Sequence, residues 1–270
     1  MQKFSVLMSV YIKEKPEHLD ECLDSLKNQT IQPSEVVLVQ DGPLSCELID
    51  IINNWKNQLN IVDVILEENK GLGQALNIGL KHCSYEIVAR MDSDDICVPD
   101  RFEYQLEIIK KDDIDLVGSW VSEFHTDPNI HTSLRQVPST HKDIIKFAQL
   151  RNPLNHPTVM YKKSVIQKHG SYEDVLYFED YFLWLKLLSN NIKMHNIQRP
   201  LVQMRAGPNL LARRRGLDYI RKELNFLNLS LERNYIKISS YLIGLLIKLP
   251  IRLLPRSPIS LVYKLLRKTN

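Results

Sequence analysis

Residues 86–95 read EIVARMDSDD, an apolar run of strand length that ends in the carboxylates of Asp92, Asp94 and Asp95. Three carboxylates this close would repel one another in a dry core, whereas a divalent cation that bridges to phosphate oxygens suits them. The cluster therefore predicts a metal and nucleotide-diphosphate site at a strand end. The alternative is a polar turn leading to Pro99, because Asp and Ser favour turns for local hydrogen-bonding reasons.

Short apolar runs alternate with helical patterns through the first half of the chain. The predicted strands lie near residues 4–10, 36–40, 61–66, 86–91 and 115–119, and the helices between them near 17–28, 45–57, 72–82 and 99–110. This alternation predicts βαβ units, an α/β fold and a mostly parallel, buried central sheet. Ligands should gather at the carboxyl ends of these strands. Asp41 follows the second run and Asp92 the fourth, so the two acids are expected at the same edge.

Asp41 and the segment after the third predicted strand suggest nucleotide binding at that edge. The carboxylate of Asp41 can accept a hydrogen bond from a nucleobase, although its position also suits a turn. Residues 69–73 read NKGLG, with Asn77 and Gly79 following, and could let the backbone approach a diphosphate where a helix begins. Leu76 stands where a dinucleotide-binding pattern needs glycine, which argues against a nicotinamide cofactor.

The composition is that of a globular protein. With 270 residues, 44% of them hydrophobic and 25% charged, the chain can bury one substantial core and carry a small appended domain. A net charge of +3, with no nucleic-acid-binding motif, argues against a nucleic-acid partner. The four cysteines form no CxxC pair, so a zinc knuckle or disulfide framework is not indicated and a reducing cytoplasm fits. The apolar run near the N-terminus is too short for a signal peptide.

The middle of the chain is less regular and carries further polar candidates. Residues 121–136 predict two short strands, and residues 141–150 and 162–169 predict helices. His156 stands between two prolines in a loop that should hold the imidazole, although such a histidine can be purely structural. Glu179 and Asp180 precede an apolar segment of helical length. Asp180 favours the positive end of that helix and could also remove a proton from a hydroxyl, and the two roles are compatible.

Together, these motifs resemble those of family 2 glycosyltransferases with the GT-A fold, the type that builds bacterial surface polysaccharides. The resemblance covers about residues 4 to 205. It implies a nucleotide-sugar site made of Val10, Tyr11, Asp41, Asn69, Gly71, Gly73, Arg90, Asp92 and Ser93. Asp41 would pair with uracil, and Asp92 would contact ribose or the sugar. Asp94 would hold Mg²⁺ or Mn²⁺ on the UDP diphosphate, while Asp95 would support the site without necessarily binding the ion.

The resemblance also implies a single inverting displacement, in which Asp180 deprotonates the acceptor hydroxyl that attacks C1 of the sugar. Glu179, His156 and Arg205 are the candidate acceptor residues. Arg205, or the arginines at 213–215, could meet the diphosphate of a lipid-linked acceptor, because guanidinium pairs bidentately with phosphate. The alternative is a solvated basic face on a long helix expected at residues 209–232.

The chain is expected to divide into a catalytic domain, residues 1–205, and a helical, basic region, residues 206–270. From Arg233 to Asn270 there are eight Lys or Arg residues and no Asp or Glu. The apolar stretches between them are too short to cross a bilayer. This pattern predicts a cytoplasmic protein held peripherally at the inner face of the cell membrane. A helical hairpin packed on the catalytic domain or on a homodimer partner is the alternative.

The expected function is transfer of a hexose from a UDP-sugar, UDP-glucose or UDP-galactose, to a HexNAc on undecaprenyl diphosphate in O-antigen or capsule biosynthesis. Resembling enzymes suggest a β-1,3 linkage. One rival is a sugar-nucleotide nucleotidyltransferase, which would want a glycine-rich loop after the first strand, where residues 9–13 contain no glycine. The other is a catalytically silent, nucleotide-binding membrane scaffold, against which the presence of both Asp94 and Asp180 argues.

Overall fold

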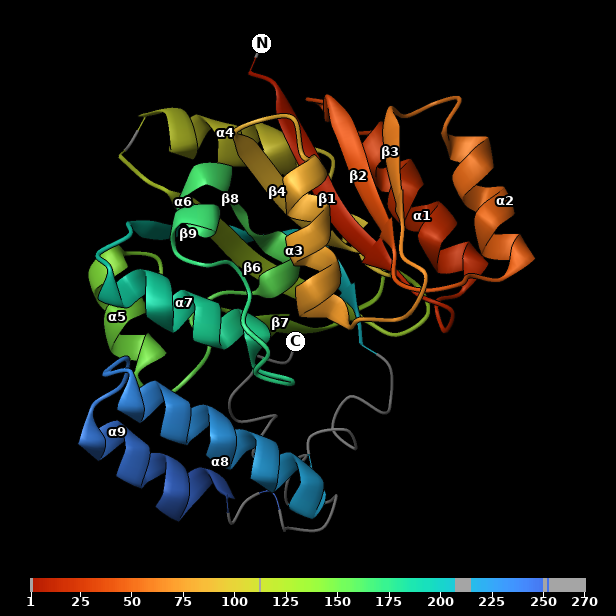
Figure 1. Cartoon of the computed structure of the whole chain (residues 1–270). Coiled ribbons are helices and arrows are strands. Elements are labelled where there is room, and N and C mark those ends of the chain that lie inside the picture. The colour runs from red at the N-terminus through yellow and green to blue at the C-terminus, as the bar shows by residue number, and fades with distance from the viewer. Residues whose placement is uncertain (1, 112, 207–214, 250–251, 253–270) are drawn as a thin grey trace.

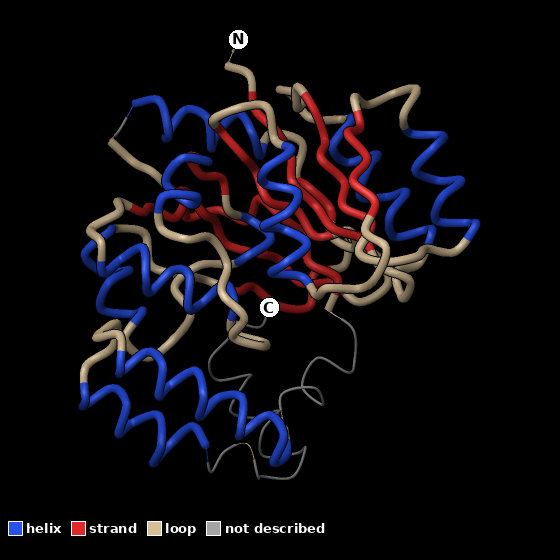
Figure 2. Tube along the Cα trace, viewed as in Figure 1, coloured by secondary structure: helices blue, strands red, loops and turns tan. Residues whose placement is uncertain are grey.

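A nine-stranded sheet with helices on both faces forms the centre of the computed structural model, which describes residues 2–111, 113–206, 215–249 and 252 (Figures 1 and 2). The strand order is β3-β2-β1-β4-β8-β6-β9-β5, and β7 pairs with β6. The strands are β1 (Phe4–Val10), β2 (Glu35–Gln40), β3 (Ile61–Ile65), β4 (Ile87–Asp92), β5 (Ile96–Cys97), β6 (Leu116–Phe124), β7 (His131–Arg135), β8 (Met160–Lys162) and β9 (Met194–Arg205). The helices are α1 (Pro16–Lys27), α2 (Cys46–Trp55), α3 (Leu72–His82), α4 (Arg101–Lys111), α5 (His141–Ala148), α6 (Lys163–Lys168), α7 (Glu179–Ser189), α8 (Gly216–Glu232) and α9 (Ile238–Ile243).

The first four long strands form the parallel part of the sheet. β1 pairs in parallel with β2 on one side and β4 on the other, and β2 pairs in parallel with β3. Their carboxyl ends therefore meet at one edge, where the direction of the crossovers reverses around β1 and ligands are expected. Beyond β4 the sheet is mixed, because β8 runs antiparallel to both β4 and β6. The predicted α/β fold is confirmed.

Side chains of β1 alternate between two hydrophobic cores. Phe4, Val6 and Met8 are fully buried in the core shared with α1, α2 and α4, whereas Leu7 is fully buried in the core shared with α3 and α7. Because successive strand residues point to opposite faces, a strand that is apolar on both faces must be covered by helices on both sides. The sheet is thus the middle of three layers, and its carboxyl edge stays open to carry the site.

Two features of the second half of the chain differ from the sequence predictions, and a third is only partly described. The predicted break between a strand at 115–119 and another from Val121 is wrong, because β6 runs unbroken through this region by pairing in parallel with β9. β8 and β9 were not predicted: β8 has three residues, and β9 contains Pro200 and mixes polar with apolar residues. The helix expected from residue 209 begins at Gly216 within the described chain, and residues 209–214 lie outside it.

Helix α3 packs unusually close to the sheet. A Cβ on Gly79 would lie 2.5 Å from Val39 Cγ2 and 2.6 Å from Leu7 Cδ1, so this glycine is needed for the close approach. Asn77, two residues earlier, uses its side-chain amide to donate to the Tyr172 carbonyl at 2.8 Å and to accept from the Tyr172 N–H at 2.9 Å. These contacts explain two motif residues whose structural purpose the sequence did not disclose.

The helical hairpin α8–α9 is packed beneath α7 (Figure 1). The ring of Phe226 in α8 stacks on Phe178 at 4.7 Å between centroids and lies 4.8 Å from Tyr181. Gly244, just after α9, brings the two helices together, since a Cβ there would lie 2.9 Å from Leu227 Cδ1. Among the helices that the structure describes, none is both long and apolar enough to span a bilayer.

Candidate active site

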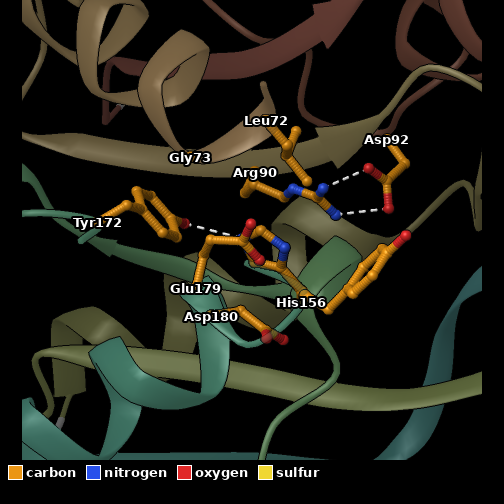
Figure 3. Close-up of a pocket in the computed structure, with 9 residues that line it drawn as sticks. Leu72, Gly73, Arg90, Asp92, His156, Tyr172, Glu179 and Asp180 are labelled. Carbon is orange, nitrogen blue, oxygen red and sulfur yellow. Dashed lines mark hydrogen bonds and ion pairs between the residues drawn. The ribbon is translucent and has the colours of Figure 1, made fainter. Parts of the chain in front are cut away.

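A pocket of about 250 Å³ opens at the carboxyl edge of the sheet (Figure 3). Its walls come from the start of α3, the end of β4, the loop before β8 and the segment that enters α7. The lining residues are Leu72, Gly73, Arg90, Asp92, His156, Tyr172, Tyr177, Glu179 and Asp180. Pockets for whole drug-sized ligands span roughly 300–1,000 Å³. This one is therefore of a size for a sugar rather than for a complete sugar nucleotide.

Arg90 and Asp92 form a two-pronged ion pair at the end of β4 (Figure 3). Nη1 of Arg90 donates to Asp92 Oδ2 at 2.6 Å, and Nη2 donates to Oδ1. The Arg90 side chain is only 1% exposed, whereas that of Asp92 is 33% exposed. Such a fork-to-carboxylate pair fixes the carboxylate and keeps lone pairs directed at the pocket. Arg90 is the one cationic side chain among the residues that line the pocket.

The acidic cluster gathers just beyond this pair. Carboxylate oxygens of Asp92, Asp94 and Asp95 lie within 4.8 Å of one another. Burial, followed by the charges of Asp92 and Glu14, raises the pKa of Asp94 to about 7. Burial, followed by the charges of Asp92 and Asp94, also raises the pKa of Asp95 well above its usual range. The sequence expectation that these carboxylates converge is confirmed by their positions.

The loop before α1 and the end of β9 hold the acidic loop in place. Ser93 Oγ donates to Glu14 Oε2 at 2.5 Å. The backbone N–H of Arg205 donates to Asp95 Oδ1 at 3.0 Å, and its Nε donates to the Asp94 carbonyl at 3.2 Å. The Arg205 guanidinium also pairs with Glu21. Ser93 and Arg205, predicted as ligand-binding residues, thus support the acidic loop and are not among the residues that line the pocket.

Asp180 lies in the first turn of α7, on the wall of the pocket below Arg90 (Figure 3). Its Oδ2 accepts a 2.7 Å hydrogen bond from Asn152 Nδ2, and its Oδ1 accepts one of 2.7 Å from the N–H of Tyr181. Burial raises the pKa of Asp180, and these two donors act against the rise. The result is a fixed carboxylate with an increased proton affinity, which is what a general base requires.

Glu179 and His156, both predicted to contact an acceptor, line the same pocket. Burial raises the pKa of Glu179, whereas hydrogen bonds from backbone N–H groups, including that of Tyr177, lower it. Burial and the nearby charge of Arg90 lower the pKa of His156 well below its usual range. His156 is therefore neutral and shares a 2.8 Å hydrogen bond between its Nε2 and the hydroxyl of Tyr172.

Asp41 organises the segment that leads into α3. Its Oδ1 accepts from the N–H of Lys70 at 2.7 Å. Its Oδ2 accepts from the N–H of Gly71 at 3.1 Å and from Asn69 Nδ2 at 3.0 Å. A carboxylate oxygen has two lone pairs, so the hydrogen bonds to Asp41 leave Oδ1 capacity for a ligand. Asp41 does not line the pocket but fixes the residues just before Leu72, which does.

The remaining predicted residues lie along the same edge. Val10 has a fully buried side chain, and only its carbonyl reaches the site, where it accepts from the N–H of Asp41 at 2.8 Å. Tyr11, the next residue, is 41% exposed. Gly71 has φ +83° and open space where a Cβ would stand, whereas a Cβ on Gly73 would lie 3.3 Å from Glu179 Cγ. Asp41 and the acidic cluster thus lie along the same edge of the sheet, and the pocket that Asp180 lines lies next to the acidic cluster.

Four residues of the site were not predicted from the sequence. Asn152 contacts Asp180, Tyr172 pairs with His156, and Tyr177 and Leu72 line the pocket. Their positions depend on contacts between distant segments, such as the one between Asn77 and Tyr172. The sequence analysis placed Asn77 only in the segment expected near a diphosphate, so its contact with Tyr172 was not predicted.

The sequence of the chain is similar to those of known glycosyltransferases. The family model described as "Glycosyl transferase family 2" matches residues 5–174. A protein of Escherichia coli named "UDP-Gal:alpha-D-GlcNAc-diphosphoundecaprenol beta-1,3-galactosyltransferase" is 41% identical, over 97% of this chain and 95% of its own length. "Amylovoran biosynthesis glycosyltransferase AmsE" of Erwinia amylovora is also 41% identical, over 98% of this chain and 99% of its own length.

Solved structures share the fold at low sequence identity. S. aureus TarS 1-349 in complex with UDP-GlcNAc has a TM-score of 0.66 at 20% identity, over 84% of this chain and 66% of that chain. Mannosyltransferase PcManGT from Pyrobaculum calidifontis, in complex with GDP-Man and Mn²⁺, has a TM-score of 0.67 at 15% identity, over 97% of this chain and 75% of that chain. These similarities confirm the GT-A fold.

Proposed function

The chain belongs to glycosyl transferase family 2, and from this premise we propose that it transfers a hexose from a UDP-sugar to a HexNAc carried on a lipid diphosphate. The observation that carries the proposal is that Asp92 and Asp180 line one sugar-sized pocket. Asp92 lies at the end of β4 next to the acidic cluster, and Asp180 lies on the facing helix. Donor sugar and acceptor hydroxyl can then meet between them.

The acidic cluster would hold a divalent cation, Mn²⁺ or Mg²⁺. Oδ2 of Asp95 is buried and has no hydrogen-bond partner in the part of the chain that the structure describes. A buried carboxylate oxygen without a partner is costly, and a cation removes that cost. Asp94 and Asp95, with Asp92 beside them, supply the hard oxygen ligands that such ions prefer. When bound, the ion would stabilise the negative charge of the leaving diphosphate.

The donor nucleotide would lie along the edge from Asp41 to Asp92. Oδ1 of Asp41 can accept the N3–H of uracil, which supports UDP over a cytidine nucleotide, whose N3 has no hydrogen to donate. The open space at Gly71 lets a ligand approach the backbone there. Tyr11 projects from the loop after β1 on the same edge, and its exposed ring can contact the nucleoside. Arg90 fixes Asp92 against the hydroxyls of the sugar.

Asp180 would act as the general base of an inverting displacement. The acceptor hydroxyl would give its proton to the Asp180 carboxylate and attack C1 of the donor sugar from the face opposite the diphosphate. Asn152 and the N–H of Tyr181 hold the carboxylate in place and favour its ionised form. Neutral His156 adds no positive charge that would compete for the carboxylate. Glu179 is the second acid of the pocket and can orient acceptor hydroxyls.

The choice of hexose and acceptor rests on the relatives. The Escherichia coli relative is named for transfer from UDP-Gal to α-D-GlcNAc-diphosphoundecaprenol in β-1,3 linkage. The similarity to this chain extends over nearly the full length of both proteins. We therefore favour UDP-galactose as donor, a GlcNAc-diphosphate-lipid as acceptor, and a β-1,3 linkage, in the assembly of a bacterial surface polysaccharide.

A lipid-linked acceptor calls for a position at the membrane surface, and α9 supports one. Ile238 and Leu242 in α9 and Leu246 in the helical segment Gly244–Lys248 that follows it recur at intervals of four residues and are 60%, 48% and 74% exposed. Such a stripe, in a region with eight basic and no acidic residues from Arg233 onward, suits the interface of an anionic leaflet. The basic residues at 256, 264, 267 and 268 lie outside the described chain, as do Arg213 and Arg214.

A donor panel with a synthetic GlcNAc-diphosphate-lipid tests the proposal. The purified chain is incubated with UDP-galactose, UDP-glucose, GDP-mannose or dTDP-glucose, with Mn²⁺ or with EDTA, and the product linkage is read by NMR. Consumption of a UDP-hexose that requires the metal and extends the acceptor supports the proposal. Transfer from GDP-mannose alone contradicts the role of Asp41 in binding uracil. Transfer from dTDP-glucose alone contradicts UDP as the donor nucleotide, although thymine carries the same N3–H as uracil. Hydrolysis of a UDP-sugar without transfer contradicts the proposal that a GlcNAc-diphosphate-lipid is the acceptor.

A further inference from the structure

Tyr177 is a strained and exposed aromatic residue at the mouth of the pocket. It lines the pocket, its side chain is 52% exposed, and its φ is +72°. The left-handed region costs a residue with a Cβ roughly 1–2 kcal/mol, and a bulky side chain there is uncommon. Burial offsets this cost only in part, because about half of the residue's surface faces solvent. Strain of this kind concentrates at functional sites.

The backbone of Tyr177 is tied to the reacting end of the pocket. Glu179, two residues later, lines the same pocket, and the next residue, Phe178, donates its N–H to the Val175 carbonyl at 2.7 Å. Phe178 is in turn stacked on Phe226 of α8. These contacts of Phe178 hold the turn in place. Tyr177 lies three residues before Asp180, the proposed general base, in the chain.

A cation from α8 lies directly over this ring. Nζ of Lys222 is 4.4 Å from the centroid of Tyr177, and the ring of Tyr219, one turn earlier in α8, is stacked with Tyr177 at 5.9 Å and 29°. Lys222 also pairs with Asp218 at 2.6 Å, but the Asp218 side chain is 77% exposed. An ion pair that reaches solvent contributes little, about 0–1 kcal/mol. Lys222 can therefore exchange Asp218 for another anion at small cost.

We infer that Tyr177 and Lys222 form the subsite for the acceptor, with the ring packed on the face of the acceptor sugar and the ammonium paired with its diphosphate. This inference rests on the proposed function and names the residues that bind its acceptor. A sugar presents C–H groups on one face, which suit the apolar body of a tyrosine ring. A lysine ammonium is a suitable point-charge partner for phosphate. An acceptor held at this rim offers its hydroxyl inward to Asp180.

The arrangement also gives α8 a purpose in the reaction. The aromatic contacts of Phe226 hold α8 against the turn that carries Tyr177, so Lys222 and Tyr177 keep a fixed relation although they come from separate segments. Lys222 adds a cation next to Tyr177 at the pocket, whereas Arg90, the one cationic residue among those that line the pocket, is paired with Asp92. The hairpin therefore completes a substrate site rather than only attaching to the catalytic layers.

Two variants and two acceptors test this subsite. Tyr177→Gly removes the ring and relieves the strain, and Lys222→Gln removes the charge. Each is assayed with a GlcNAc-diphosphate-lipid and with a GlcNAc alkyl glycoside that lacks phosphate. We expect Tyr177→Gly to raise the KM of both acceptors by about 10-fold or more, a loss of about 1.4 kcal/mol or more. We expect Lys222→Gln to raise the KM of the diphosphate acceptor alone by a similar factor.

The controls separate this inference from a merely structural role. UDP affinity, measured by calorimetry, should stay at the wild-type value in both variants, and the melting temperature of Tyr177→Gly should not fall. Tyr104→Ala is the matched control, because Tyr104 is also exposed with a guanidinium, that of Arg199, 4.7 Å from its ring centroid. It should keep the wild-type KM for both acceptors.

Three outcomes overturn the subsite while the wild type transfers hexose. These are a wild-type acceptor KM in both variants, an equal effect of Lys222→Gln on the two acceptors, and a loss of UDP affinity equal to the loss of acceptor affinity. Absence of transfer by the wild type to either acceptor overturns the proposed function itself. The two failures are therefore distinguishable.

Discussion

Asn152 donates a 2.7 Å hydrogen bond from its side-chain amide to Oδ2 of Asp180, across 28 positions of the chain. The bond joins the loop before β8 to the first turn of α7. It holds the Asp180 carboxylate toward the pocket and stabilises its ionised form, against burial that favours the neutral form. A base in this state is fixed in direction and raised in proton affinity, and its consequences can be measured.

Replacing Asp180 with Asn should nearly abolish transfer, because the amide cannot take the proton of the acceptor hydroxyl. We expect kcat to fall by a factor on the order of 10² to 10⁴, with UDP affinity retained. Glu179→Gln is the matched control, since Glu179 is the neighbouring acid of the same pocket, and it should lose clearly less. Steady-state kinetics with the diphosphate acceptor decide the matter, and an Asp180→Asn enzyme that turns over normally would remove Asp180 from the chemistry.

Replacing Asn152 with Ala should move the acid limb of the pH profile of kcat/KM to higher pH. The amide of Asn152 lowers the pKa of Asp180, so its loss raises that pKa and a higher pH is needed to ionise the base. Activity should then be reduced on the acid side and recover as the pH rises. A uniform loss at every pH, with the limb unmoved, would show that Asn152 acts on packing instead of on the base.

Replacing Asp41 with Asn should weaken UDP binding and the fold together. The amide offers one acceptor oxygen where the carboxylate receives the N–H groups of Lys70 and Gly71 and the amide of Asn69. Loss of one hydrogen bond to a buried charged group costs about 1.5–3 kcal/mol, and urea unfolding should show a loss of this size. Asp115→Asn, which breaks the 2.9 Å pair with Lys162, is the control and should leave UDP affinity unchanged. If the Asp41→Asn protein binds UDP with wild-type affinity, residues other than Asp41 bind the uracil.

Replacing Gly79 with Ala should destabilise the protein by roughly 1–3 kcal/mol through overpacking, because the new methyl would lie 2.5 Å from Val39 Cγ2. Gly244→Ala is the comparison. There the nearest atom is 2.9 Å away at the end of the Leu227 side chain, which can rotate aside, so the cost should be smaller. Thermal unfolding of both variants tests the order, and equal stability of Gly79→Ala and the wild type would contradict the close packing of α3.

The sequence was most informative where a local pattern alone determines position. Asp41 and Asp92 were expected at one edge because parallel strands end together, and the structure places both at the carboxyl ends of β2 and β4. The helices α1 and α3 were expected within one residue of their observed bounds, since amphipathic spacing and the glycines of the loop mark them. Local rules suffice where an element is long and periodic.

Contacts between distant segments of the chain could not be predicted from the sequence. Nothing in residues 150–157 discloses that Asn152 meets Asp180, and the left-handed turn at Tyr177 follows no glycine or asparagine that would mark it. Arg205 was expected to face an acceptor phosphate, but its side chain pairs with Glu21 and its backbone with Asp95. The partners of these side chains depend on how β9 and α8 pack in the folded protein, which local sequence patterns do not determine.

A crystal structure of the chain with UDP and Mn²⁺ would test most directly whether the separate acids serve one donor site. We predict that uracil lies next to Asp41 and that the diphosphate lies at the acidic cluster, with the ion held by Asp94. The β-phosphate, which carries the sugar in a UDP-sugar, should point into the pocket lined by Asp92 and Asp180. UDP bound away from the edge between Asp41 and Asp94, or an ion held without contact to Asp94, would contradict the proposed site.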